Sequence, residues 1–193
     1  MQRRFLLDGL NLMVSVVVAA MTSAMVMLMA GTLGAANAQS LQNGAPSGPQ
    51  SRALTILAFG DSLTAGYGLP GSAAFPAQLQ KALEARGRKI VIQNAGVSGD
   101  TAQAGLDRLD WSIGDGIDGV IVELGANDAL RGLDPAQTKA ALDAILTRLK
   151  QRGLPVLLAG MLAPPNMGPA YRQRFDGLYA ELAVRHGVAL YPF

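Results

Sequence analysis

The feature that most constrains this chain is a regular alternation of short apolar runs with amphipathic stretches after about residue 53. Five runs have the length and composition of buried strands, at 54–59, 90–93, 119–124, 156–161 and 188–191. Four intervening stretches repeat apolar residues at helical spacing, at 75–83, 101–109, 142–149 and 171–182. Such alternation implies crossovers between parallel strands. We therefore predict an α/β domain, a three-layer flavodoxin-like fold around a doubly wound parallel five-stranded sheet.

The first 52 residues have a different character. A basic start is followed by an apolar run at about 12–33 and by the small-residue exit Ala36-Asn37-Ala38, which is typical of a signal peptide over 1–38. We expect cleavage before Gln39 and a periplasmic or secreted protein. The apolar run could also span a bilayer, so an inner-membrane anchor at 12–33 is the alternative. Residues 39–52 then form a flexible linker, and 53–193 the folded domain.

Charge and cysteine content exclude several classes of function. Without residues 1–38 the chain keeps 14 basic and 13 acidic residues, a net charge of +1. Such a balance offers no electrostatic surface for nucleic acid. Because the sequence has no cysteine, disulfides, thiolate metal sites and a cysteine nucleophile are ruled out.

Three other patterns lead to no cofactor or metal site. Residues 66–71 fit the dinucleotide pattern G-x-G-x-x-G, but they do not follow the strand directly and Pro70 interrupts them. The aspartates between 107 and 118 lack calcium-loop spacing, and the chain has one histidine. We predict that Trp111, the only tryptophan, serves packing.

Polar, glycine-containing segments follow the first three predicted strands. They are Gly-Asp-Ser-Leu at 60–63, Ser-Gly-Asp-Thr at 98–101 and Gly-Ala-Asn-Asp at 125–128. Ligands of doubly wound sheets bind beyond the carboxyl ends of the strands, where the strand order reverses. We therefore expect all three segments to lie along one rim.

The residues of these segments suit acyl transfer when they are taken together. Taken singly, they are typical of helix caps and turns: Ser62, Gly99, Asn127, Asp61, Asp100 and Asp128. Together, a serine hydroxyl can attack a carbonyl while nearby donors stabilise the resulting oxyanion. The backbone N–H groups of Ser62 and Gly99 and the side-chain amide of Asn127 supply three such donors.

The motifs at 60–63, 94–101 (Asn-Ala-Gly-Val-Ser-Gly-Asp-Thr) and 122–128 (Val-Glu-Leu-Gly-Ala-Asn-Asp) resemble those of the SGNH or GDSL hydrolases. The resemblance extends over about 53–193 and is greatest to bacterial periplasmic acyl-CoA thioesterases that are also lysophospholipases and arylesterases. It implies Ser62 as nucleophile and Gly99 and Asn127 as oxyanion donors.

The same resemblance implies where substrate binds. The loop at 162–168 corresponds to the family's acyl site, so we place Leu162, Ala163 and Pro164, together with Asp61, among the substrate-binding residues. The expected substrates are small acyl esters, thioesters or lysophospholipids. We expect no nucleic-acid partner, membrane contact only through the signal or anchor, and a monomer.

One family motif is absent from these residues. The Asp-x-x-His that supplies the general base and its orienting carboxylate lies downstream of the strand at 188–191 in the family. The only histidine, His186, precedes Gly187 at a predicted helix end, where a structural role is favoured and the side chain lies away from the rim. We therefore expect a domain truncated at its C-terminus and nearly inactive by itself.

Two other functions stay open at this point. A carbohydrate O-acetyl esterase would use the same serine and the same oxyanion donors on a shorter acyl group. An inactive, truncated relative would act at most as a binding module.

Overall fold

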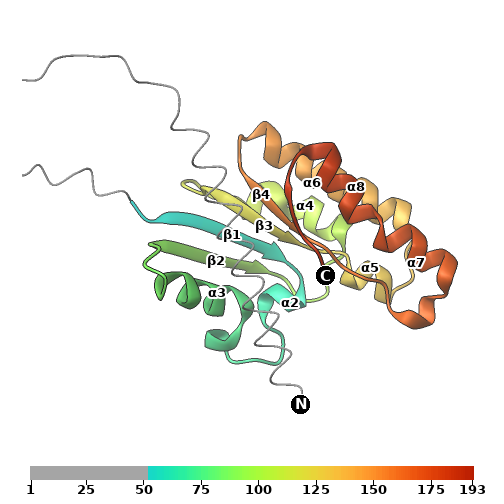
Figure 1. Cartoon of the computed structure of the whole chain (residues 1–193), viewed down its shortest axis with the longest axis horizontal. Helices are drawn as coiled ribbons and strands as arrows, with labels where there is room; N and C mark the ends of the chain where they lie inside the picture. Colours follow the sequence, from blue (N-terminus) through green and yellow to red (C-terminus); the bar gives the residue numbers. More distant parts are fainter. Residues whose placement is uncertain (1–51) are drawn as a thin grey trace, which may run out of the picture. The chain divides into compact units, whose positions relative to one another are not determined.

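The predicted apolar runs form a five-stranded parallel sheet in the order β2-β1-β3-β4-β5 (Figure 1). Its strands are β1 (Leu54–Gly60), β2 (Ile90–Gly96), β3 (Gly119–Glu123), β4 (Val156–Ala159) and β5 (Ala189–Tyr191). The computed structural model describes residues 52–193, so the predicted signal peptide or anchor and nearly all of the linker lie outside the described residues. The strand order is that of the flavodoxin-like fold, as predicted.

The helices occupy the intervals between the strands. They are α2 (Ser62–Ala65), α3 (Phe75–Glu84), α4 (Ala102–Ser112), α5 (Ala126–Leu130), α6 (Pro135–Gln151), α7 (Pro169–Asp176) and α8 (Leu178–His186), with 3-10 turns η1 (Gly71–Ala73) and η2 (Pro165–Met167). In Figure 1, α3 lies beside β2, whereas α4, α6 and α8 lie together beyond β3 and β4. Helices therefore cover both sides of the sheet.

The prediction of one helix over 171–182 was wrong. The segment is divided at Gly177, which ends α7 and precedes α8. The aromatic stripe nevertheless continues across the break: the Tyr171 ring stacks on Phe175, and Phe175 meets the Tyr179 ring edge-on, both at 5.9 Å between centroids. Periodicity alone did not reveal the break because the apolar face stays continuous through it.

The main core lies between the sheet and α4, α6 and α8. Side chains alternate along a strand, so Leu57 and Phe59 of β1 point to the same face and join this cluster. The apolar stripe of α6 is completely buried at Ile145 and Leu149. Trp111 does not take part: its side chain is 88% exposed, so the prediction that it serves packing was wrong.

The two edges of the sheet differ. β5 has three residues, whereas β2 has seven and pairs with β1 on one side. Two N–H groups of β2 are bonded to side chains: Ile92 N–H donates to Gln80 Oε1 of α3 (2.8 Å), and Gly96 N–H donates to Asn94 Oδ1 (2.9 Å). Side chains therefore occupy part of the hydrogen-bonding capacity of this long edge strand.

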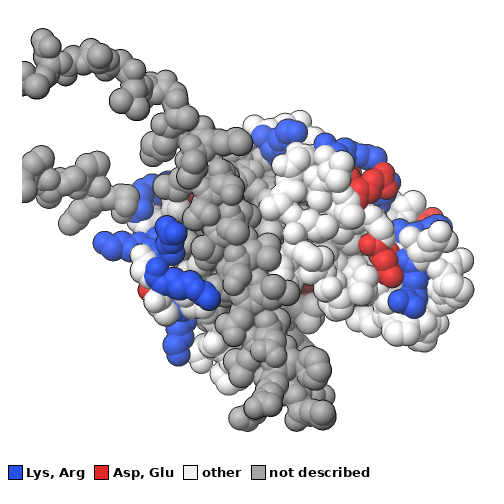
Figure 2. All heavy atoms as spheres, in the orientation of Figure 1, with Lys and Arg blue, Asp and Glu red and all other residues white. Residues whose placement is uncertain are grey.

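The surface carries charges of both signs. Figure 2 shows Lys and Arg side chains beside Asp and Glu side chains on the part of the face formed by the C-terminal helices. Glu181 of α8 accepts from Lys139 of α6 (2.6 Å) and from Arg185 of α8 (3.2 Å). Within residues 52–193, no helix is long and apolar enough to cross a membrane.

Candidate active site

The ends of β1, β2 and β3 bring the three predicted polar segments together. Gly60, the last residue of β1, is paired with Gly96 of β2 on one side and with Glu123 of β3 on the other. The Val97 N–H donates to the Gly60 carbonyl (3.0 Å), which fixes the start of the loop after β2. The strand order reverses at β1, so the segments meet at the switch point where doubly wound folds bind ligands.

Ser62 is the first residue of α2 and does not cap it. The cap is Asp61, whose Oδ1 accepts from the Leu63 N–H (2.9 Å). The interpretation of Ser62 as a simple N-cap was therefore wrong. Within the described residues the Ser62 hydroxyl has no hydrogen-bond partner, and the side chain is partly exposed at the rim. The hydroxyl is thus available to react.

Two backbone donors in the rim segments have no acceptor within residues 52–193. In the part of the chain that the structure describes, neither the Ser62 N–H nor the Gly99 N–H has an acceptor. Gly99 has φ +90°, a conformation that L side chains rarely adopt. Its carbonyl, which belongs to the following peptide group, accepts from the guanidinium of Arg131 (2.7 Å). Free backbone donors at such a turn suit a developing oxyanion.

The amide of Asn127 lies at the same rim but is already engaged. Its Nδ2 donates to Asp61 Oδ2 (3.1 Å) and to the Asp100 carbonyl (2.9 Å). A primary amide has two N–H hydrogens, so both are used here. Asn127 can serve as an oxyanion donor only when one of these two hydrogen bonds is released.

A buried carboxyl that the sequence reading did not single out lies beneath this turn. Glu123 at the end of β3 is 8% exposed, and its Oε2 accepts from the Thr64 hydroxyl of α2 (2.8 Å). Burial, and secondarily the neighbouring Asp61 carboxylate, raise the pKa of Glu123 to about 8. Burial also raises the pKa of Asp61, opposed by the Leu63 N–H. Only the spatial arrangement reveals this pair.

Arg108 of α4 is a second supporting residue that sequence reasoning missed. Its Nε donates to Asp100 Oδ2 (2.6 Å), and another guanidinium nitrogen donates to the Gly60 carbonyl (2.9 Å). The guanidinium also lies 4.2 Å from the centroid of the Phe59 ring. One cation thus ties the loop after β2 to the end of β1. In the sequence, only the presence of an arginine eight residues after Asp100 could have indicated this contact.

Asp128, which could have been a simple cap or turn residue, links three helices instead. It is 2% exposed; Oδ2 accepts from the Ala102 N–H of α4 (2.8 Å) and Oδ1 from the Thr138 hydroxyl of α6 (3.0 Å). Because Asp128 follows Asn127 in α5, these contacts hold the helix that carries the amide.

The predicted substrate-binding residues need two corrections. Asp61 is completely buried and its oxygens accept from Leu63 and Asn127, so it supports the site from below and cannot contact substrate directly. Ala163 is 3% exposed and packs in the core. Leu162 is exposed and Pro164 partly exposed, so these two are the predicted substrate-binding residues that remain accessible.

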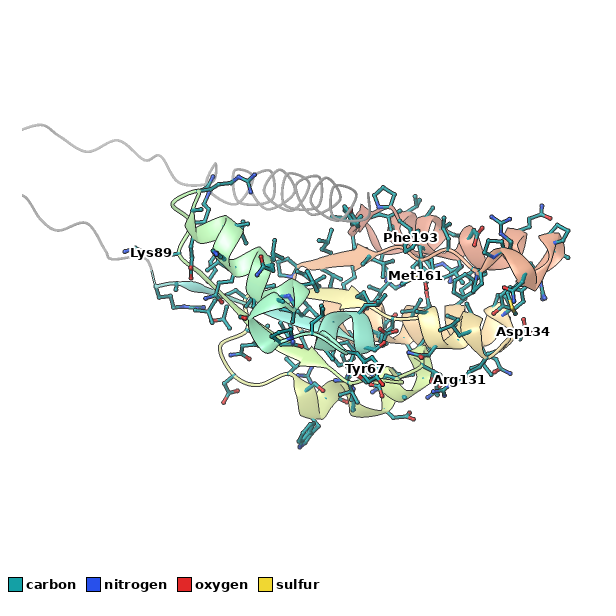
Figure 3. All side chains as sticks on the ribbon, turned by 90° about the horizontal axis from the view of Figure 1, so that it is seen from below. Tyr67, Lys89, Arg131, Asp134, Met161 and Phe193 are labelled. Atoms are coloured by element: carbon teal, nitrogen blue, oxygen red, sulfur yellow. The ribbon has the colours of Figure 1, made fainter. Side chains whose placement is uncertain are left out.

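The rim also exposes large apolar side chains. Each of the three segments has one within three residues of its key group: Leu63 beside Ser62, Val97 before Gly99 and Leu130 after Asn127, with exposed fractions of 55, 43 and 70%. Figure 3 shows Tyr67 of the α2–η1 turn and Arg131 on the same lower side of the view, with Lys89, which precedes β2, at the opposite end of the sheet. Each of the three rim segments thus carries an exposed apolar side chain.

His186 lies at the other end of the sheet. It is the last residue of α8, and its Nε2 lies 2.8 Å from Asp143 Oδ1 of α6. Since α8 leads into the amino end of β5, the predicted structural role agrees with this position. Among residues 52–193, no cluster of three or more His, Cys, Asp or Glu side chains is arranged to hold a metal ion.

Comparison with known proteins gave consistent matches. The family described as GDSL-like lipase/acylhydrolase matches residues 58–193. The chain is 40% identical over 145 residues to esterase TesA of Pseudomonas aeruginosa, covering 75% of this chain and 72% of that protein. It is 41% identical over 148 residues to thioesterase 1/protease 1/lysophospholipase L1 of Escherichia coli strain K12, covering 72% of this chain and 66% of that protein.

Solved structures agree with these matches. The SGNH-hydrolase family esterase AlinE4 is 50% identical with a TM-score of 0.72, over 74% of this chain and 77% of that chain. The crystal structure of TesA is 40% identical with a TM-score of 0.69, over 72% of this chain and 78% of that chain.

Proposed function

The chain belongs to the GDSL-like lipase/acylhydrolase family, and we propose that it forms the nucleophile and oxyanion half of a serine hydrolase acting on carboxylic esters and thioesters. The observation that carries this proposal is the unpartnered Ser62 hydroxyl at the same rim as two backbone N–H groups without acceptors, those of Ser62 and Gly99. Of the described serines, only Ser62 begins a helix at the switch point.

The proposed reaction is a two-step acyl transfer. The Ser62 oxygen attacks the carbonyl carbon while its proton passes to a general base, and the Ser62 and Gly99 N–H groups stabilise the oxyanion. The carbon–oxygen or carbon–sulfur bond then breaks, the alcohol or thiol takes up a proton, and water releases the acyl group from Ser62. No metal or cofactor is required for these steps.

The described residues do not provide the base. His186 is bonded to Asp143 near the amino end of the sheet, on the side opposite the rim. The family resemblance assigns the base to an Asp-x-x-His segment that follows the strand corresponding to β5. Without a base the hydroxyl stays protonated at neutral pH, and loss of a triad histidine lowers turnover on the order of 10⁶-fold in a protease of similar chemistry.

The exposed apolar side chains favour a substrate with an apolar acyl or aryl group. Leu63, Val97 and Leu130 are exposed on the three rim segments, and Leu162 adds a fourth exposed side chain on the loop after β4. Burial of such surface by a hydrocarbon chain is favourable, whereas a carbohydrate acetyl ester gains little from it. Acyl esters and thioesters, including lysophospholipids, are therefore preferred over O-acetyl sugars, in keeping with the names of the relatives.

We also propose that residues 1–38 direct export to the periplasm or beyond. The support is the apolar run that ends at Ala36-Asn37-Ala38.

An esterase assay with two versions of the protein tests the function. The first is the 193-residue chain, and the second carries after Phe193 the Asp-x-x-His segment of a related esterase. On a p-nitrophenyl ester we expect the second to turn over and the first to be slower by several orders of magnitude. Ser62→Ala in the extended version should abolish turnover and leave the urea midpoint of unfolding unchanged.

Two results would contradict the proposal. Turnover retained in Ser62→Ala would place the nucleophile elsewhere. Normal turnover of the 193-residue chain would mean that it contains a base that we have not identified. Labelling of the extended version by a fluorophosphonate, with the modified peptide identified by mass spectrometry, gives an independent assignment of Ser62.

A further inference from the structure

Glu123 is a buried ionisable group at the rim that the reaction does not use. It lies under the turn that carries Ser62: its Oε2 accepts from the Thr64 hydroxyl (2.8 Å), and the backbone N–H groups of Asp61 and Thr64 also face its carboxyl group. Its Oε1 is buried and has no hydrogen-bond partner within the described residues. Glu123 therefore touches the residues on both sides of Ser62, and one of its oxygens is left without a partner.

The neighbouring carboxyl belongs to Asp61, which is completely buried. The ionisable groups around the pair come from every adjacent element: Asp100 after β2, Arg108 on α4, Asp128 on α5 and Tyr179 on α8. The one cation among them, Arg108, is paired with Asp100. Two buried carboxylates in contact cannot both be ionised cheaply, so the pair retains one proton.

The hydrogen bonds of the pair favour Glu123 as the residue that holds this proton. Asp61 accepts two N–H donors, from Leu63 and Asn127, which stabilise its charged form. Glu123 accepts only one hydroxyl with good geometry, and its pKa is raised to about 8. A protonated Glu123 has one O–H to donate, and Asp61 is the acceptor beside it.

The hydrogen bond to Asp61 in turn limits whether the Asn127 amide can donate to an oxyanion. Both hydrogens of the Asn127 amide are engaged, one of them with Asp61 Oδ2 (3.1 Å). A carboxylate that already accepts an O–H is a weaker acceptor for the amide than a bare one. We propose that Glu123 is a positioning residue that carries a proton at neutral pH and donates it to Asp61, which weakens the Asp61–Asn127 hydrogen bond and lets the amide turn to the oxyanion.

The proposal has a definite pH dependence. When Glu123 loses its proton near pH 8, Asp61 becomes a bare carboxylate and holds the Asn127 amide more strongly. The second negative charge also opposes an oxyanion nearby. The amide environment of Asn127 should therefore change in a single step centred near the pKa of Glu123.

NMR on the full 193-residue chain tests this without any turnover. The 15N–1H signals of the Asn127 side-chain amide and the 13C signal of the Glu123 carboxyl are followed from pH 5 to 10. Both should shift with one common midpoint near pH 8. In Glu123→Gln, whose amide always donates, the Asn127 signals should lose this step. Thr64→Val is the control: it removes the hydroxyl contact to Glu123 and should retain the step, with a shifted midpoint.

Asp61→Asn is the second variant, because it replaces the acceptor while leaving Glu123 in place. It should lower the Glu123 midpoint by removing the like charge and abolish the Asn127 step. A Glu123 carboxyl that titrates near 4.5, or an Asn127 step that persists in Glu123→Gln, would overturn the proposal.

The effect of the Glu123–Asp61–Asn127 hydrogen bonds on catalysis rests on the proposed esterase function. In the extended, active version we expect kcat to fall above about pH 8, and this fall should disappear in Glu123→Gln while KM changes little. If the NMR step occurs but no version hydrolyses esters, the esterase proposal fails and the positioning of Asn127 by Glu123 stands. If esters are hydrolysed but the NMR step does not occur, the esterase proposal stands and the positioning of Asn127 by Glu123 fails.

Discussion

Gly125→Ala should destabilise the protein by about 4 kcal/mol, and the cost should depend on one hydroxyl group. Gly125 is the N-cap of α5 and has φ +116°, a backbone conformation that costs an alanine roughly 1–3 kcal/mol. An added Cβ would also lie far closer to the Tyr179 hydroxyl than van der Waals contact allows, and this hydroxyl donates to the Leu124 carbonyl (2.9 Å). Displacing this hydroxyl leaves a buried carbonyl unsatisfied, at about 1–3 kcal/mol more.

The two contributions can be separated with Tyr179→Phe. Without the hydroxyl, the nearest remaining atoms to the added Cβ are ring carbons of residue 179 at 3.4 Å and of Phe175 at 3.6 Å, which is ordinary contact. Gly125→Ala in the Tyr179→Phe background should then cost only the backbone strain. The double variant should be about 2 kcal/mol more stable than additivity predicts.

Urea unfolding of the four proteins, followed by circular dichroism, measures this coupling. Gly187→Ala is a matched control, because Gly187 also has a positive φ (+65°) but nothing lies within 4 Å of its added Cβ. It should lose roughly 1–2 kcal/mol, with no coupling to Tyr179→Phe. Additivity of Gly125→Ala and Tyr179→Phe within about 0.5 kcal/mol would refute the reasoning.

Two further predictions concern parts of the chain away from the rim. The His186 contact is the largest of the effects that hold the pKa of Asp143 below its usual value, so the pair contributes stability above about pH 4 that is lost as the pH falls through the lowered pKa. His186→Ala should therefore lower the free energy of unfolding by under about 1 kcal/mol at pH 6, because Asp143 is partly exposed, and should not change it at pH 2. Urea midpoints of unfolding at the two pH values measure this difference. An equal loss at both would contradict the pairing. Amino-terminal sequencing of the exported protein should start at Gln39, whereas an intact amino terminus in the membrane fraction would favour the anchor.

The strands and the reacting serine could be predicted because their signals are local. A buried parallel strand is a short apolar run, and the rim residues follow these runs directly in the sequence. The exposure of Trp111 could also have been inferred: it lies two positions after the buried Leu109 in α4, and residues two apart on a helix do not share a face. The hydrophobicity of the side chain predicted packing, whereas its position on the helix predicts exposure.

The supporting contacts could not be predicted from the sequence. Asp61 and Glu123 are 62 positions apart, and only the register of β1 and β3 brings them together. The same holds for Asp128, which meets Thr138 and Ala102 of two other helices. No local rule distinguishes an aspartate that caps its own helix from one that crosses to another, because both patterns are a polar residue next to a helix start.

The hydrogen bonds along β2 bear on how the protein behaves at high concentration. A seven-residue strand at the border of a sheet is a template on which another molecule can add a strand, the first step of many aggregates. Here Gln80 and Asn94 already accept from the Ile92 and Gly96 N–H groups. An incoming strand would have to displace both side chains before it could pair with β2. The longer edge strand of the sheet is therefore protected against the addition of a strand from another molecule.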